Sequence, residues 1–286
     1  MPSGLQQMAA HALLSYSWEN MQKGKRSMEN QFRTLLQNDK VTVGTRLWST
    51  EPYVTELVGI TGQFDYVEFA AEYSAFGQKD LENLARAAEL HGMGSMIKVD
   101  LQNRGYVAQK AVASGFQAVL FSDHRTAEEV RESIRLIKPM TRGVDGLYGS
   151  PTRRFIRMDL RATQEQHIQR LQDVVLCFMI EKPEAMDELE AICQLPGVDM
   201  VQFGPSDYSL SMGWNRGECG EKLKEIEKQM IETALKYNVR PRCEINSAEE
   251  AKWYMDLGVR DLSIGDEVRI LENYWTKEGQ KLRSML

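Results

Sequence analysis

Two acidic residues stand at the ends of apolar segments that have the composition of buried strands. Glu181 directly follows residues 174–180, and Asp207 follows residues 198–203 after a short turn. Carboxylate oxygens are hard ligands that suit Mg²⁺ and similar cations, and a cation held by two protein groups keeps positions open for a substrate. The spacing therefore predicts a metal site at the ends of two neighbouring strands. The alternative is that Glu181 pairs with Lys182 or caps a helix, and that Asp207 caps a helix.

The turn before Asp207 consists of Gly204, Pro205 and Ser206. Glycine permits a close approach to the backbone, and proline stiffens the turn. Backbone amides near Ser206 and Asp207 could hold a carboxylate, as successive amides do in anion-binding concavities. We therefore predict that Gly204, Pro205 and Ser206 bind the substrate.

The elements that must position these residues alternate along the chain. Amphipathic helical stretches lie between most of the apolar segments, and several of them end at glycine. About eight strand–helix units favour a closed (β/α)8 TIM barrel, in which active sites lie at the carboxyl ends of the strands. No Gly-x-Gly-x-x-Gly motif follows the first strand, which disfavours a dinucleotide fold. The predicted strands are residues 42–48, 64–69, 94–99, 117–121, 174–180, 198–203, 240–245 and 259–264.

Three further segments complete the predicted organisation. Residues 1–36 read as an N-terminal helical extension, and residues 37–286 as the barrel with a C-terminal helical tail. Residues 142–173 fit the alternation poorly because they contain several glycines and many charges. We interpret them as a long active-site or interface loop that ends in a helix from about residue 162 to 172.

The composition of the 286-residue chain narrows the classes of function. A hydrophobic fraction of 42% supports a sizeable core, and a formal net charge of −6 disfavours binding to nucleic acid or to an anionic membrane. The four cysteines have no C-x-x-C spacing, which disfavours structural zinc and a disulfide framework. With no secretory signal and no membrane-spanning run, the sequence favours the cytoplasm.

Several short motifs occur in a fixed order along most of the chain. They are Gly44-Thr45-Arg46-Leu47-Trp48, Phe64-Asp65-Tyr66-Val67, Thr141-Arg142-Gly143-Val144, Ile180-Glu181, Pro196-Gly197-Val198-Asp199, Phe203-Gly204-Pro205-Ser206-Asp207, and Leu257-Gly258 through Ile264-Gly265. Through this ordered set, from about residue 28 to 270, the chain resembles the HpcH/HpaI aldolase family. These are the class II pyruvate aldolases of the phosphoenolpyruvate/pyruvate superfamily of barrels.

The resemblance implies a metal-dependent lyase that acts on a 2-oxo acid. Glu181 and Asp207 would be the protein ligands of Mg²⁺, Mn²⁺ or Co²⁺, and the cation would stabilise the pyruvate enolate left when a carbon–carbon bond breaks. It also implies a homo-oligomer, a hexamer or a dimer-based assembly, in which the last helices are exchanged between subunits. The apolar tail residues that could serve this role are Ile270, Leu271, Tyr274, Trp275 and Leu282.

The chain departs from the family where the proton-transfer groups belong. The family's Asp-x-Glu-His pattern after the second strand is Ala70-Ala71-Glu72-Tyr73 here. A tyrosine with a pKa near ~10 is a poor base at neutral pH but a capable proton donor. The loss of a positioned base lowers a rate by roughly 10²–10⁴. Glu72 and Tyr73 remain predicted catalytic residues.

Two further departures lie on the third and fourth strands. Lys98 stands where the family has an arginine that contacts the keto oxygen, and lysine lacks the planar fork. A role for Lys98 in catalysis and an ion pair with Glu72 or Glu68 both remain open. After the fourth strand, His124 could supply the missing acid–base group; the alternative is an ordinary loop residue before a helix cap at Thr126.

Arg142, in the predicted loop, could shape the substrate site or form a loop salt bridge.

Three functions follow from the residues described above. The first is a carbon–carbon lyase, which we favour. The second is an oxaloacetate-type decarboxylase or another bond cleavage next to a 2-oxo acid, which needs no hydroxyl base. The third is a barrel that binds a small acid without catalysis, and the presence of Glu181 and Asp207 argues against it.

Overall fold

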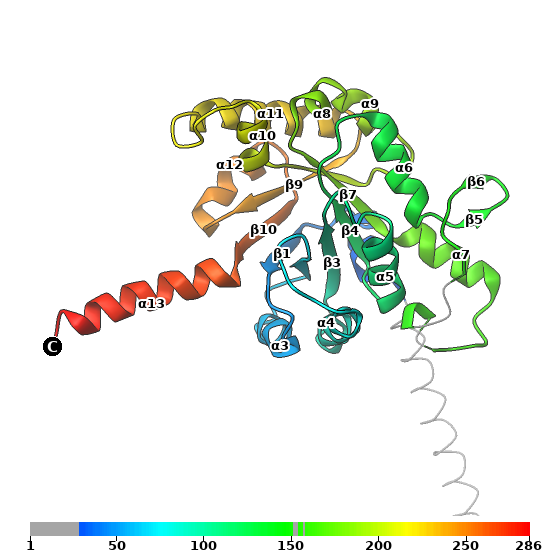
Figure 1. Cartoon of the computed structure of the whole chain (residues 1–286), viewed down its shortest axis with the longest axis horizontal. Helices are drawn as coiled ribbons and strands as arrows, with labels where there is room; N and C mark the ends of the chain where they lie inside the picture. Colours follow the sequence, from blue (N-terminus) through cyan, green and yellow to red (C-terminus); the bar gives the residue numbers. More distant parts are fainter. Residues whose placement is uncertain (1–28, 151–153, 157) are drawn as a thin grey trace, which may run out of the picture.

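Eight parallel strands close into a barrel in the computed structural model, which describes residues 29–150, 154–156 and 158–286 (Figure 1). The order around the barrel is β1-β10-β9-β8-β7-β4-β3-β2. The predicted (β/α)8 fold is therefore confirmed. The barrel strands are β1 (Thr42–Leu47), β2 (Tyr66–Ala70), β3 (Gly94–Val99), β4 (Ala118–Phe121), β7 (Val175–Ile180), β8 (Met200–Phe203), β9 (Arg240–Ile245) and β10 (Asp261–Asp266).

Most barrel strands are buried on both faces. Every residue of β2, β3, β4, β7 and β8 is buried, because helices cover the outside and side chains fill the inside. On the outer side, Phe69, Ile97, Phe121 and Phe178 belong to the large core shared with the helices. This explains why the strands are continuous apolar runs in the sequence.

The helices follow the predicted alternation. Thr126 caps α6 by accepting a hydrogen bond from the amide of Glu129, and Gly115 ends α5 in the left-handed conformation with a φ of 111°. The helices around the barrel are α3 (Pro52–Ile60), α4 (Gln78–Leu90), α5 (Tyr106–Ser114), α6 (Ala127–Ile137), α7 (Gln164–Asp173), α8 (Pro183–Asp187), α9 (Leu189–Cys193), α10 (Pro205–Ser211), α11 (Gly220–Lys236), η2 (Ala248–Glu250) and α12 (Ala251–Asp256).

A short helix, α2 (Gln31–Gln37), packs against the amino-terminal end of the barrel. Phe32 is fully buried and stacks on Tyr66 with ring centroids 4.5 Å apart. Arg33 forms a two-pronged ion pair with Asp199 at 2.6 and 2.7 Å. The described part of the predicted N-terminal extension is thus packed on the barrel. Residues 1–28 lie outside the described residues, and the predicted boundary at residue 36 stays a prediction.

The segment between α6 and β7 forms a hairpin of β5 (Met140–Thr141) and β6 (Val144–Asp145), followed by η1 (Arg154–Ile156) and α7. The Lys138 ammonium donates hydrogen bonds to the carbonyl oxygens of Gln172 and Val174, just before β7 begins. The hairpin therefore leaves the barrel at the amino-terminal ends of the strands, opposite to the end where the strands finish.

The last helix, α13 (Glu267–Arg283), projects away from the barrel (Figure 1). None of its residues is buried, and its apolar side chains, Tyr274 and Trp275 among them, are exposed. Within the described residues, no helix combines the length and the apolar character needed to cross a lipid bilayer.

Candidate active site

A cavity of about 300 Å³ opens at the carboxyl-terminal ends of the strands. Its position is the one at which (β/α)8 enzymes build their active sites, because loops from all eight strands converge there. Seven of the residues predicted to form the site line this cavity. They are Tyr73, Lys98, Glu181, Gly204, Pro205, Ser206 and Asp207.

Glu181 follows the last residue of β7 and is only 2% exposed. One of its carboxylate oxygens, Oε1, accepts a hydrogen bond from the backbone amide of Asp123 at 2.7 Å. Burial raises the pKa of Glu181 to about 7; Lys98 opposes this rise, and the nearby Asp207 carboxylate adds to it. A positive ion beside Glu181 and Asp207 would offset both the burial and the repulsion.

Gly204 is required by the packing around Glu181. A Cβ at this position would lie 2.6 Å from Oε2 of Glu181 and 2.9 Å from the methyl carbon of Met179. The backbone conformation of Gly204 is ordinary, with a φ of −112°. The predicted close approach is therefore an approach of the Glu181 side chain to the Gly204 backbone, and it fixes where the carboxylate lies.

The residues after Gly204 begin α10, with Pro205 at its first position and Asp207 in its first turn. The Ser206 hydroxyl oxygen accepts a hydrogen bond from Arg216. The substrate-binding role of Gly204, Pro205 and Ser206 stays a prediction.

The donor set fits a divalent cation that binds substrate directly. Glu181 and Asp207 offer hard carboxylate oxygens at one cavity wall, which are the ligands that Mg²⁺ and Mn²⁺ prefer. No group of three or more His, Cys, Asp or Glu side chains capable of holding a metal occurs in the described part of the chain. A cation held by these two carboxylates would therefore take its remaining ligands from substrate and water.

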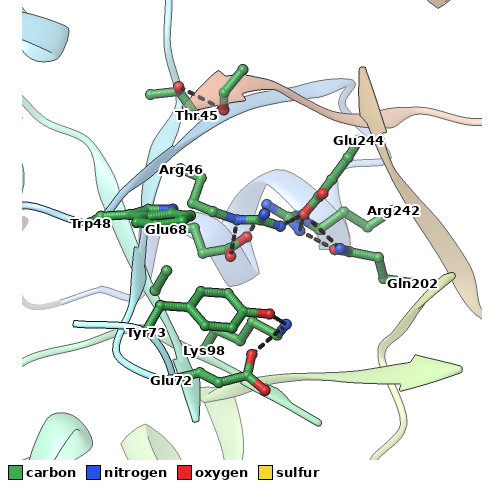
Figure 2. A network of polar contacts seen from close by, with 12 residues as sticks. Thr45, Arg46, Trp48, Glu68, Glu72, Tyr73, Lys98, Gln202, Arg242 and Glu244 are labelled. Carbon is green, nitrogen blue, oxygen red and sulfur yellow. Dashed lines mark hydrogen bonds and ion pairs between the residues drawn. The ribbon is translucent and has the colours of Figure 1, made fainter. Parts of the chain in front are cut away.

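A second group of polar side chains faces Glu181 from β3 and the loop after β2. The Lys98 ammonium lies 2.6 Å from Oε2 of Glu72 and 3.0 Å from the Tyr73 hydroxyl oxygen (Figure 2). Burial opposes the charge on Lys98, but Tyr73, Glu72 and Glu181 outweigh burial and raise its pKa above the ordinary value. Of the two ion-pair partners that the sequence left open for Lys98, the structure has Glu72.

Tyr73 is half exposed, and its ring packs against Trp48 with centroids 5.5 Å apart. Burial raises the pKa of Tyr73 above its usual value, although Lys98 opposes the shift. Tyr73 therefore carries its proton at neutral pH, and the residue lines the cavity.

Charged and polar residues also form the floor beneath the cavity, and three of them, Arg46, Gln202 and Arg242, were not among the predicted site residues. Arg242 is fully buried and donates to Glu68 at 2.5 Å and to Gln202 (Figure 2). Arg46 donates to Glu68 at 3.0 Å and pairs with Glu244. Although burial opposes it, Arg242 and Arg46 lower the pKa of Glu68 to about 2. The sequence signal that could have identified this floor is a charged residue within each of several otherwise apolar strands.

His124 is not brought to the cavity. It is fully buried between the barrel and α6, where Nε2 lies 2.8 Å from the Ser133 hydroxyl oxygen and the ring packs edge-on against Phe121 and Phe178. Burial, aided by Arg104, lowers the pKa of His124 to about 3. An acid–base role requires contact with substrate, so we do not retain the hypothesis for His124.

Arg142 is also distant from the cavity. It lies exposed at the turn between β5 and β6, a hairpin that Figure 1 shows near α7. Its side chain does not line the cavity in this chain. The predicted role in shaping the substrate site therefore finds no support within one subunit, because the hairpin leaves the barrel at the opposite end.

Comparison with known proteins gives one consistent result. The model of the HpcH/HpaI aldolase/citrate lyase family matches residues 49–250. The hydroxypyruvate/pyruvate aldolase of Delftia acidovorans is 24% identical over 247 residues, which cover 85% of this chain and 88% of the relative. The 4-hydroxy-2-oxo-heptane-1,7-dioate aldolase of Escherichia coli is 24% identical over 245 residues, covering 85% and 91%.

A solved structure agrees on the fold. The HpcH/HpaI aldolase from Desulfitobacterium hafniense superimposes with a TM-score of 0.77 at 23% identity, over 87% of this chain and 95% of that one. At this identity the likeness concerns the arrangement of the strands and helices.

Proposed function

Because this chain belongs to the HpcH/HpaI aldolase/citrate lyase family, we propose that it is an aldolase-type lyase that cleaves a carbon–carbon bond of a 2-oxo acid with a divalent cation. Glu181 and Asp207 would hold the cation, which is Mg²⁺, Mn²⁺ or Co²⁺. The observation that carries the proposal is that both carboxylates line one cavity at the carboxyl ends of the strands. A bound cation would stabilise negative charge on the pyruvate half of the substrate as the bond breaks.

The residues of the chain would position the reacting groups. The Asp123 amide holds Oε1 of Glu181 at 2.7 Å, and the missing Cβ of Gly204 leaves space for Oε2. Lys98, charged and buried, faces Glu181 and supports negative charge on the substrate. Lys98 also fixes the Tyr73 hydroxyl at 3.0 Å, and Glu72 fixes Lys98. Tyr73 is then the proton donor to the carbon of the pyruvate enolate, and the proton of the substrate hydroxyl passes to water as the aldehyde leaves.

A second candidate function is favoured by the protonated state of Tyr73. Retro-aldol cleavage needs a group that removes the proton of the substrate hydroxyl, and Tyr73 carries a proton of its own at neutral pH. Decarboxylation of an oxaloacetate-like acid needs no such base, since carbon dioxide leaves and the remaining carbanion takes up a proton. Tyr73 suits that second step.

Pyruvate release from a panel of substrates tests both functions. Chelator-treated full-length protein is assayed with Mg²⁺, Mn²⁺ or Co²⁺, against 4-hydroxy-2-oxo acids and against oxaloacetate. Metal-dependent release from a 4-hydroxy-2-oxo acid is the result expected for the lyase. Release from oxaloacetate alone would replace the lyase with the decarboxylase. No metal binding and no release from any substrate would overturn both and favour a barrel that only binds a small acid.

We also propose that the protein is a homo-oligomer in which α13 packs on a neighbouring copy. Supporting this, α13 buries none of its own residues. Large apolar side chains are exposed along α13 and also on α3 and α12, the helices that follow β1 and β9. They are Tyr53, Leu57 and Ile60 on α3, Met255 on α12, and Val268, Ile270, Leu271, Tyr274, Trp275 and Leu282 on α13.

Light scattering after size exclusion measures this assembly. The wild-type mass is expected to be a multiple of the 32.7 kDa chain. The double variant Tyr274→Asp with Trp275→Asp should be a monomer, because it places two charges in the contact. A wild-type mass of one chain would contradict the proposal.

A further inference from the structure

Two arginines line the side of the cavity away from Lys98 and Tyr73. Arg216 comes from the loop after α10, and Arg269 from the first turn of α13. Both are exposed, and the hydrogen bonds that their guanidinium groups donate go to neutral oxygens. Arg216 donates to the Ser206 hydroxyl, and Arg269 donates to the side-chain amide oxygen of Asn246.

The two cations on the other side of the cavity are already neutralised. Lys98 pairs with Glu72 at 2.6 Å, and Arg46 pairs with Glu68 and Glu244. Among the described residues, by contrast, Arg216 forms no ion pair, and the contact of Arg269 with Asp266 is long, at 3.9 Å. A guanidinium has five N–H donors in a fixed fork, so both arginines have donors to spare for an anion.

Arg269 is held in place by its own chain, although it lies on the projecting helix. Its side chain reaches back to Asn246 in the segment after β9, and its backbone amide donates to the capping carboxylate of Asp266 at 2.8 Å. Arg269 therefore belongs to the same cavity as Glu181 and Asp207, wherever the far end of α13 packs.

We propose that Arg216 and Arg269 form a second anion subsite that binds a carboxylate at the far end of the substrate. This rests on the proposed function, in which Glu181 and Asp207 engage the 2-oxo acid end. The substrate is then a dicarboxylate rather than a 2-oxo acid with a neutral tail. Glu250 and Asp266 line the same side of the cavity, so a singly charged carboxylate is better tolerated there than a doubly charged phosphate.

Two substrates that differ only in the far carboxylate test the subsite. We compare kcat/KM for pyruvate release from 4-hydroxy-2-oxoheptane-1,7-dioate and from 4-hydroxy-2-oxoheptanoate. The wild-type protein should favour the diacid by about tenfold or more, since hydrogen bonds to charged groups stabilise more than neutral ones. Arg216→Gln and Arg269→Gln should each lower the diacid-to-monoacid ratio by roughly tenfold. Arg131→Gln, an exposed arginine on α6, is the control and should leave the ratio unchanged.

Calorimetry measures ligand binding to the subsite directly, so this test does not depend on turnover. The paired ligands are 2-oxoadipate and 2-oxohexanoate, titrated into Mn²⁺-loaded wild-type protein and both variants. Tighter binding of 2-oxoadipate by about tenfold, lost in Arg216→Gln and Arg269→Gln, is the expected result. Equal binding of the two ligands by the wild-type protein would overturn the subsite, whether or not pyruvate is released. Preference for the diacid without pyruvate release would instead leave the subsite standing and overturn the lyase.

Discussion

The rim of the barrel has two sides that relate differently to the family pattern. On the side of β7 and β8, Glu181, Gly204 and Asp207 match the family motifs and lie together on the cavity wall. On the side of β2 and β3, the resemblance predicts a histidine where this chain has Tyr73 and an arginine where it has Lys98. The first side, called the matching side below, would bind the 2-oxo acid. The second, called the altered side, would transfer the proton. Membership of the family therefore informs the first step far more than the second.

The two sides nevertheless interact electrostatically. The Asp123 amide, after β4, bonds Glu181 at 2.7 Å, and the charge of Lys98 lowers the pKa of Glu181 against the effect of burial. A substitution on the altered side can therefore change the pKa and the metal affinity of the Glu181–Asp207 pair. For each variant, metal binding is therefore measured as well as the rate.

The largest effect is expected from the matching side. Glu181→Gln keeps the volume of the side chain but removes the charge, so the variant should bind Mn²⁺ weakly and lose pyruvate release by about 10³-fold or more, the equivalent of several kcal/mol of transition-state stabilisation. Glu184→Gln, an exposed carboxylate on α8, is the control. Unchanged Mn²⁺ affinity in Glu181→Gln, measured by calorimetry, would remove the difference between the two sides.

Tyr73→Phe tests the altered side alone. Removal of the hydroxyl should lower kcat by roughly 10²-fold, the contribution of a positioned proton donor, while Mn²⁺ affinity stays close to that of the wild-type protein. Tyr53→Phe, an exposed tyrosine on α3, should have no effect on kcat. A Tyr73→Phe protein with wild-type kcat would mean that the altered side takes no part in proton transfer.

Gly204→Ala should disturb the matching side without changing a carboxylate. The new Cβ would lie 2.6 Å from the Glu181 side chain and would displace it. Residues that orient metal ligands typically contribute 10–100-fold in affinity, so Mn²⁺ binding should weaken by about tenfold or more. Gly220→Ala, where no atom lies within 4 Å of the added carbon, should bind Mn²⁺ as the wild-type protein does.

The smallest effect on rate is expected from His124→Asn. Turnover per folded molecule should stay within about twofold, whereas the free energy of unfolding should fall by about 1–3 kcal/mol, because the bond to Ser133 and the aromatic contacts are lost. Urea unfolding and kcat are measured on the same preparation. A large loss of kcat in a stable His124→Asn protein would return this residue to the altered side of the site.

The barrel could be predicted closely from the sequence because its strands are buried on both faces. Residues 94–99 and 240–245 were predicted with the bounds of β3 and β9, and the other strands differ at their ends by a few residues. That Glu181 and Asp207 line one cavity could be predicted because strand ends in a barrel face the same rim.

The loops and the polar floor could not be predicted in the same way. Asp123 has a left-handed φ of 63°, and His124 after it lies in the core beside α6. The residue types do not reveal that His124 lies in the core and not at the cavity. Arg142 belongs to a hairpin that turns away from the rim, although its segment is rich in glycine as active-site loops often are. The Arg242–Glu68 pair joins residues that are 174 positions apart, a separation that no local pattern encodes.

That buried pair also determines how the chain could be divided. Glu68 on β2 is fully buried, and its strongest partner, Arg242, arrives only with β9. A fragment that ends after β4 would bury a carboxylate without that partner, and breaking such pairs destabilises a fold by about 3–5 kcal/mol. Half-barrels cut from this chain should therefore fold only when both pieces are mixed, whereas a circular permutant that keeps every strand should fold by itself.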